Sequence, residues 1–425
     1  MWYNKVIQVF KIKELRNKIL FILGVFALFR IMANIPMPGI NAENLKNFFD
    51  QFQMFGLLNV FTGGALDKLS IVMLGLGPYI TSVIILQLLT MIFPQLEKIY
   101  KEEGEAGKKK FNQYGRIATI PLAGLQGYAM LSLFQRQGVI PSLSPLILLS
   151  SLLTIIAGTV FLMWLGELIT ERGIGNGVSL LIFAGIIADF PNNLRQILVT
   201  WDPAQIPSYI IFFVMALFII AGVVLITEGR RNIPVSYAKR VRGTKMFGGV
   251  STYLPLNVNP AGVMPIIFAL SILLFPQMIT GFLEGGGGIF ANIASNINNF
   301  LGNPWTHGIL YFLLVAIFTF FYTNVTFDPK AIADNLQKMG GFVPGIRPGE
   351  STAKFIRYIL NRVLMIGALF LGIIAVMPSI VGGITGILVF SFLIGGTSLL
   401  IGVSVILETM KQVNAQLQMR EYETF

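Results

Sequence analysis

Residues 363–407 read VLMIGALFLGIIAVMPSIVGGITGILVFSFLIGGTSLLIGVSVIL, which is 45 residues without one Asp, Glu, Lys, Arg or His. A helix needs ~20 apolar residues to cross the hydrocarbon layer of a bilayer, so this stretch is long enough for two crossings. The whole chain of 425 residues is 54% hydrophobic and only 12% charged. That composition excludes a soluble globular domain and predicts a polytopic, all-α membrane protein.

Apolar stretches of this kind recur along the chain. We expect ten spanning helices, at about residues 18–36, 74–94, 115–135, 146–168, 176–190, 206–227, 260–282, 307–326, 359–378 and 384–407. Two of these spans contain a proline away from their ends. Pro121 and Pro265 are therefore expected to kink the third and the seventh span.

The basic residues alternate between the two sides of the expected spans. Of the 31 Lys and Arg residues, 26 fall in the two terminal segments and in every second gap, and five fall on the other side. Basic residues gather on the cytoplasmic side of membrane proteins, so we expect a multi-pass protein of the cytoplasmic membrane with both termini inside. Topology and attraction to anionic lipid account for the net charge of +11, and no nucleic-acid partner is implied.

The chain offers little of the side-chain chemistry that an enzyme or a transporter needs. The expected spans have almost no ionisable residue at mid-depth, the only histidine is His307 at an outer edge, and there is no cysteine. A phosphate-binding loop of the GxxxxGK[ST] type is also absent. We therefore expect no catalytic residue, metal or cofactor, and a passive conduit driven from outside. A solute transporter is the runner-up, although it would need a mid-membrane site, and a lipid scramblase is a third alternative.

Two kinds of segment stand out from the spans. Residues 61–70 (FTGGALDKLS) are too short and polar to cross, and the hinge Gly75-Leu76-Gly77-Pro78 follows them. We interpret them as a re-entrant half-helix beside a cavity, with an outer-surface loop as the alternative. Two long basic loops, at about 228–258 and 327–358, are expected to be cytoplasmic. The second mixes turn residues with apolar ones, which favours a docking surface for a macromolecule over a lipid-facing patch.

Motifs along nearly the whole chain resemble those of the bacterial SecY family, whose members are the central subunit of the Sec protein-conducting channel. The matching stretches are residues 75–80 (GLGPYI), 87–89 (QLL), 170–177 (TERGIGNG), 237–240 (YAKR), 252–256 (TYLPL), 261–265 (AGVMP), 342–350 (FVPGIRPGE) and 395–401 (GGTSLLI).

This resemblance implies a fold and a function. The fold would be two inverted five-helix halves, residues 1–200 and 201–425, around an hourglass pore closed by a plug at about 57–70. The function would be to translocate unfolded polypeptides and to release apolar segments, such as those of signal peptides, sideways into lipid. SecE-like and SecG-like subunits would be membrane partners, and a ribosome or the SecA motor ATPase would supply the driving force.

The resemblance also implies roles for individual residues. The narrowest point would be a ring of aliphatic side chains, Leu76, Ile80, Val178, Ile182, Ile267 and Ile401. The plug would include Phe61, Gly63, Gly64, Leu66 and Leu69. A lateral gate between the second and seventh spans would involve Ser82, Gln87, Gln126, Ser271 and Phe275. The docking surface would include Lys239, Arg240, Lys245 and Arg347. The chain departs from the family at Leu76 and Val178, where isoleucine is usual, and at Thr244 and Lys245, where some relatives have a basic pair.

Overall fold

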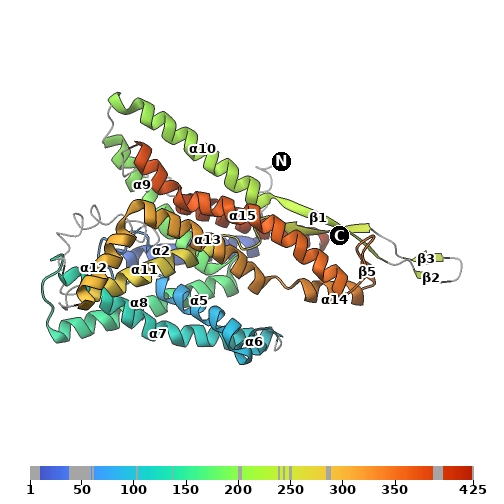
Figure 1. The fold of residues 1–425 in the computed structure, drawn as a ribbon, viewed down its shortest axis with the longest axis horizontal. Helices are drawn as coiled ribbons and strands as arrows, with labels where there is room; N and C mark the ends of the chain where they lie inside the picture. Colours follow the sequence, from blue (N-terminus) through green and yellow to red (C-terminus); the bar gives the residue numbers. More distant parts are fainter. Residues whose placement is uncertain are drawn as a thin grey trace.

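The computed structural model describes residues 10–37, 59, 62–101, 104–136, 138–199, 203–237, 240–242, 245–247, 251–283, 289–385 and 396–423. Long helices make up most of it, and the strands lie together at one end of an elongated molecule (Figure 1). The first group of helices is α2 (Lys13–Ala33), α5 (Gly77–Ile92), α6 (Pro94–Lys101), α7 (Gly104–Arg136), α8 (Pro145–Arg172) and α9 (Gly177–Val199). The second is α10 (Ile206–Glu228), preceded by the short 3-10 helix η1 (Pro203–Gln205), then α11 (Met264–Leu283), α12 (Ile289–Gly302), α13 (Pro304–Thr326), α14 (Pro329–Lys338), α15 (Glu350–Thr385) and α17 (Gly396–Glu423).

Several helices begin with a polar cap followed by proline. The Asn303 side chain accepts a hydrogen bond from the backbone N–H of Trp305 at 3.0 Å, just before Pro304 opens α13. The Asp328 side chain accepts from the N–H of Lys330 at 2.9 Å in the same way at α14. The cap satisfies an N–H that has no partner inside the helix, and proline has no N–H to leave unsatisfied there. These local signals set the starts of the helices independently of their packing.

The helices pack as two groups that meet along two seams. In the first group α5 packs on α7, α7 on α8, and α8 on α9. In the second group α11 packs on α13, α13 on α15, and α17 contacts α10 and α15. The groups meet where α11 contacts α5 and α7, and where α17 contacts α9. One large apolar cluster includes buried side chains from both groups, so the core of the molecule lies across these seams.

The helices that could cross a membrane agree with only part of the expected count. Among the described residues, five helices are long and apolar enough, namely α7, α8, α10, α13 and α15. Helices α5 and α6 form a further candidate pair, bent by 116° at the break between them. Shorter apolar helices lie at 177–188 and 264–273. Residues 386–395 of the expected tenth span lie outside the described residues, so the count of ten stays a prediction.

The expected kink at Pro265 is wrong. Helix α11 begins at Met264, so Pro265 lies in its first turn, where a missing N–H breaks no intrahelical bond. The proline inside α11 is Pro276. Pro121 does lie inside its helix, α7.

The two long basic loops are joined by a β-sheet that the sequence analysis did not predict. Strand β1 (Arg230–Tyr237) pairs antiparallel with β4 (Ser251–Asn257) of the same loop. Its other edge pairs with β5 (Gly341–Phe342) of the second loop, which gives the order β4-β1-β5. Beneath the sheet Ile233, Leu256, Val343 and Ile356 form a small apolar core. The two loops are therefore one folded unit, and a hairpin of β2 (Arg240–Arg242) and β3 (Lys245–Phe247) extends from its end (Figure 1).

The segment before α5 is not the expected half-helix over residues 63–70. Residues 63–76 form a run of turns that ends at α5, and Phe61 lies outside the described residues. The backbone φ angle is positive at Gly63, Gly64, Leu69 and Gly75, which interrupts a right-handed helix. The alternative of an outer-surface loop does not hold for most of this turn segment either, because nearly all of it except Asp67 and Lys68 is buried.

The turn segment is placed by close backbone contacts with α8 and α9. A Cβ atom built on Gly158 of α8 would lie 2.1 Å from the carbonyl oxygen of Ile71. A Cβ atom built on Gly63 would lie 2.8 Å from the Cα atom of Gly185 in α9. Backbone at membrane depth is tolerated only where protein surrounds it, and these glycines allow that enclosure.

We predict that Gly158→Ala destabilises the protein by about 2 kcal/mol, because the added methyl group has to displace backbone rather than a flexible side chain. The measurement is the melting temperature of the protein in detergent. Gly24→Ala is the matched control, since it adds the same atom to a helix where nothing lies within 4 Å. Equal melting temperatures for the two variants would contradict the close approach of residue 71 to α8.

Candidate functional site

Six aliphatic side chains from both helix groups meet in the large apolar cluster. Leu76, Ile182, Ile267 and Ile401 are buried members of it, and Ile80 and Val178 pack against it partly buried. They come from the start of α5, the start of α9, the start of α11 and the start of α17. The structure therefore places all six residues of the expected ring in or against one apolar cluster, and their arrangement as a ring stays a prediction. We call these six residues the waist.

Helix starts hold the waist side chains in place. The Asn176 side chain accepts hydrogen bonds from the backbone N–H groups of Val178 at 3.0 Å and Ser179 at 3.2 Å, which caps α9. At α5 the N–H of Ile80 donates to the carbonyl of Leu76 at 3.0 Å. Because each pair of waist residues lies within the first turns of its helix, a rigid helix start fixes where the side chains lie.

The chemistry of the waist is that of hydrocarbon. Its side chains offer no hydrogen bond to water or ions, and a narrow aliphatic constriction excludes both. Among the described residues no three His, Cys, Asp or Glu side chains come close enough to hold a metal ion. An aliphatic arrangement of this kind is suited to sealing a path.

The turn segment ends at the waist residue Leu76. Ala65 and Val72 belong to the same apolar cluster as the waist. Leu66 and Leu69 are fully buried in a second cluster, with Leu131 and Phe134 of α7 among its members. The segment therefore bridges the two cores of the molecule. Of the expected plug residues, Gly63, Gly64, Leu66 and Leu69 lie in this segment, and Phe61 is outside the described residues.

Backbone hydrogen bonds tie the turn segment to the end of α2. The N–H of Met37 donates to the carbonyl of Leu69 at 2.9 Å, and the N–H of Ile71 donates to the carbonyl of Ile35 at 3.0 Å. The Arg30 guanidinium donates to the carbonyl of Gly63 at 2.5 Å. These bonds satisfy backbone groups that a turn would otherwise leave unpaired in an apolar surrounding.

The expected gate residues lie on helices that do meet, but some of their polar groups have other partners. The hydroxyl of buried Ser82 donates to the carbonyl of Gly115 in α7 at 2.7 Å, and the Gln126 side chain donates to the Thr81 hydroxyl at 3.4 Å. These bonds join α5 to α7 and do not reach α11. The Ser271 hydroxyl donates within its own helix, to the carbonyl of Ile267 at 2.9 Å.

Two further gate positions were expected, Gln87 and Phe275. Gln87 is buried on α5, and its carbonyl oxygen has no hydrogen-bond partner among the described groups. The side chain of Phe275 lies outside the described residues.

The expected docking residues lie on the folded unit at the strand end of the molecule. Arg347 is exposed on the turn between β5 and α15. Its carbonyl accepts a hydrogen bond from the Thr352 hydroxyl at 2.9 Å, which fixes the turn to the start of α15. Arg240 and Lys245 lie on the β2–β3 hairpin, although their side chains are outside the described part, as is all of Lys239.

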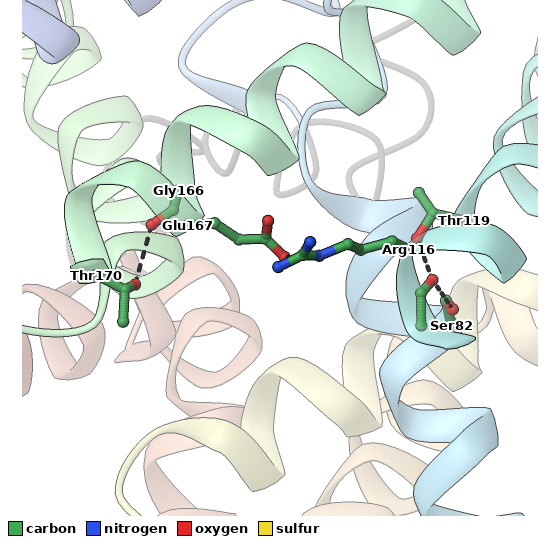
Figure 2. A network of polar contacts seen from close by, with 7 residues as sticks. Ser82, Arg116, Thr119, Gly166, Glu167 and Thr170 are labelled. Atoms are coloured by element: carbon green, nitrogen blue, oxygen red, sulfur yellow. Dashed lines mark hydrogen bonds and ion pairs between the residues drawn. The ribbon is translucent and has the colours of Figure 1, made fainter. Parts of the chain in front are cut away.

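An ion pair near the waist was not predicted from the sequence. The Nε atom of Arg116 on α7 lies 2.6 Å from Oε1 of Glu167 on α8 (Figure 2). In the sequence, Arg116 is one of the 26 basic residues that follow the alternation of charge. The available signal was Glu167, because an acidic residue inside the expected span 146–168 needs a partner.

Comparisons with known proteins show the family to which this chain belongs. The SecY family model matches residues 70–410. The protein translocase subunit SecY of Streptomyces coelicolor is 43% identical over 98% of both chains. The one from Mycobacterium bovis is 42% identical over 97% of both chains.

Solved structures share the fold. One described as a protein conducting channel superposes with a TM-score of 0.64 at 20% identity, covering 93% of this chain and 91% of the other. Sec61 in the canine ribosome-channel complex from the endoplasmic reticulum gives a TM-score of 0.63 at 19% identity, with the same coverage. The matched family and the near-complete coverage of its members lead to one conclusion: this chain belongs to the SecY family, as a multi-pass subunit of a protein-conducting channel.

Proposed function

We propose that the waist is the seal of an hourglass pore through which unfolded polypeptides cross the membrane. The observation that supports this proposal is that six aliphatic residues at the starts of four helices, from both groups, lie in or against one apolar cluster. An aliphatic collar resists water and ions when empty, since it offers them no hydrogen bonds. It binds no side chain specifically, so it can deform around chains of any sequence.

The proposal extends to the closing and lateral opening of the pore. Residues 63–70 of the turn segment are the described part of the plug, because Ala65 belongs to the same apolar cluster as the waist and Arg30 of α2 holds Gly63. The seam between α11 and the pair α5 and α7 is the lateral gate. An apolar segment of a signal peptide or a membrane protein would leave through this seam, driven by burial of about twenty apolar residues in lipid.

We further propose that the strand end of the molecule faces the cytoplasm of the cell. Helix α6, helix α14 and the sheet lie toward one end, and α12 lies at the other (Figure 1). Most basic residues fall in or next to the first set of elements. The positive-inside preference then puts that end and both termini in the cytoplasm.

The folded unit at that end is the proposed docking surface for a ribosome or a SecA motor ATPase. A ribosome is part of the complex from which the Sec61 structure comes, and that supports the ribosome as a partner. SecE-like and SecG-like subunits complete the proposed complex. The chain itself is proposed to carry out no covalent reaction and to need no cofactor, so the partner supplies the energy.

We predict that Ile401→Asn raises the ion conductance of reconstituted channels about tenfold, because a buried amide supplies the hydrogen bonds that an aliphatic waist withholds. The measurement is ion flux across proteoliposomes of equal protein content. Ile406→Asn is the control, since Ile406 is on the same helix and is 45% exposed, outside the waist. An unchanged flux for Ile401→Asn, with the protein folded, would show that the waist is not the seal.

We also predict that Arg347→Glu weakens binding of the ribosome or the motor by about fivefold or more, because an exposed arginine on a rigid turn is a typical binding anchor. Binding to the channel in nanodiscs measures this, at fixed salt. Lys330→Glu is the control: it reverses a charge on the same unit, at the first turn of α14, where an acidic residue suits the helix. Equal loss of binding in both variants would indicate general electrostatic attraction instead of a specific contact.

A further inference from the structure

The ion pair between Arg116 and Glu167 is part of a larger polar network (Figure 2). The two charged atoms lie 2.6 Å apart, and the side chains are 46% and 19% exposed, respectively. The proposed pore function does not use this pair, and the waist contains no charge. The contacts on either side of the ion pair therefore indicate its role.

On the α7 side, the pair adjoins a bond to α5. The carbonyl of Gly115 accepts two hydroxyl hydrogen bonds at 2.7 Å, one from Ser82 of α5 and one from Thr119 of α7. Ser82 and Thr119 are both fully buried. Gly115 and Arg116 are consecutive, so one turn of α7 makes both contacts. The Gly115 carbonyl bonds to α5, and the Arg116 side chain pairs with α8.

On the α8 side, the pair adjoins a bond to α9. The Thr170 hydroxyl donates to the carbonyl of Gly166 at 3.0 Å and accepts the backbone N–H of Gly177 at 2.9 Å. A Cβ atom on Gly177 would lie 1.8 Å from the carbonyl oxygen of Gly166, so the two backbones are in direct contact. A Cβ atom on Gly166 would lie 3.5 Å from Val178 Cγ2, so this turn of α8 lies against a waist residue.

These contacts form a continuous chain from α5 through α7 and α8 to α9. Helix α5 starts with Leu76 and Ile80, and α9 starts with Val178 and Ile182, so the chain links both waist pairs of the first helix group. We propose that Arg116 and Glu167 are positioning residues whose ion pair sets the distance between these two waist pairs. This inference rests on the proposed sealing function of the waist.

The ion pair is the link in this chain that can change. On the α7 side its neighbours are buried hydrogen bonds, which are costly to leave unpaired. On the α8 side the Thr170 bonds are part-buried, but the backbones of Gly166 and Gly177 are in direct contact. The ion pair is partly exposed, so water can replace either partner at small cost. When it separates, α5 and α7 stay joined through Ser82 and move together relative to α8 and α9. Since α5 and α7 are also the helices that meet α11, the pair couples the waist to the gate seam.

Spin-label distances test this coupling directly. The chain has no cysteine, so labels on Ile85→Cys of α5 and Trp164→Cys of α8, both at exposed positions, report only the spacing of these two helices. We expect Glu167→Gln to shift or broaden the distance distribution by about 2 Å, the scale of helix shifts in switching proteins. The charge swap Arg116→Glu with Glu167→Arg is expected to restore the parent distribution. Lys411→Gln, which removes the ion pair of α17 with Glu228, is the control and should leave it unchanged.

Ion flux gives the second readout. Glu167→Gln should raise it about fivefold and the charge swap should reverse most of that rise. A parent-like distance distribution in Glu167→Gln overturns the proposal, and so does a charge swap that fails to restore it. Parent-like flux in Glu167→Gln, in a preparation where Ile401→Asn leaks, also overturns it. If the waist were not the seal, the results would differ. Ile401→Asn would not raise the ion flux, while Glu167→Gln would still change the spin-label distances.

Discussion

The contact between aliphatic side chains of the two helix groups is the interaction on which the rest of the structure depends. The waist residues are buried or partly buried in one cluster to which both groups contribute. The attraction between such surfaces is non-directional, so it tolerates a change in spacing that a network of charges would not. A seal that has to open around different polypeptides needs this property.

Polar groups near the waist serve to place it. Backbone groups of the turn segment form hydrogen bonds with residues at the end of α2. Because Gly158 has no side chain, the turn segment can approach α8 closely. The hydroxyls of Ser82 and Thr170 join α5 to α7 and α8 to α9, with the ion pair between these joined pairs. Directional bonds therefore set the positions of the helices, while the surface that would meet the translocating chain has no such bonds.

The strand end of the molecule folds as a small domain with its own apolar core beneath three strands. Charged loops that were only lipid-facing would need no such core. The pairing of β1 with β5 fixes the turn that carries Arg347 relative to the sheet of the first loop, so a partner would meet one rigid surface there.

The sequence alone determined the membrane class, the approximate positions of most long apolar helices, the charge asymmetry and the aliphatic character of the waist, because these depend on composition and local pattern. The resemblance to the SecY family identified the six waist residues. From the sequence pattern alone, each is indistinguishable from other apolar residues of a spanning helix. Only the tertiary structure decided that two loops share a sheet, that residues 63–76 are turns, and that Arg116 meets Glu167. Those features join residues distant along the chain, or depend on close backbone approach, and no local pattern encodes which partners will meet.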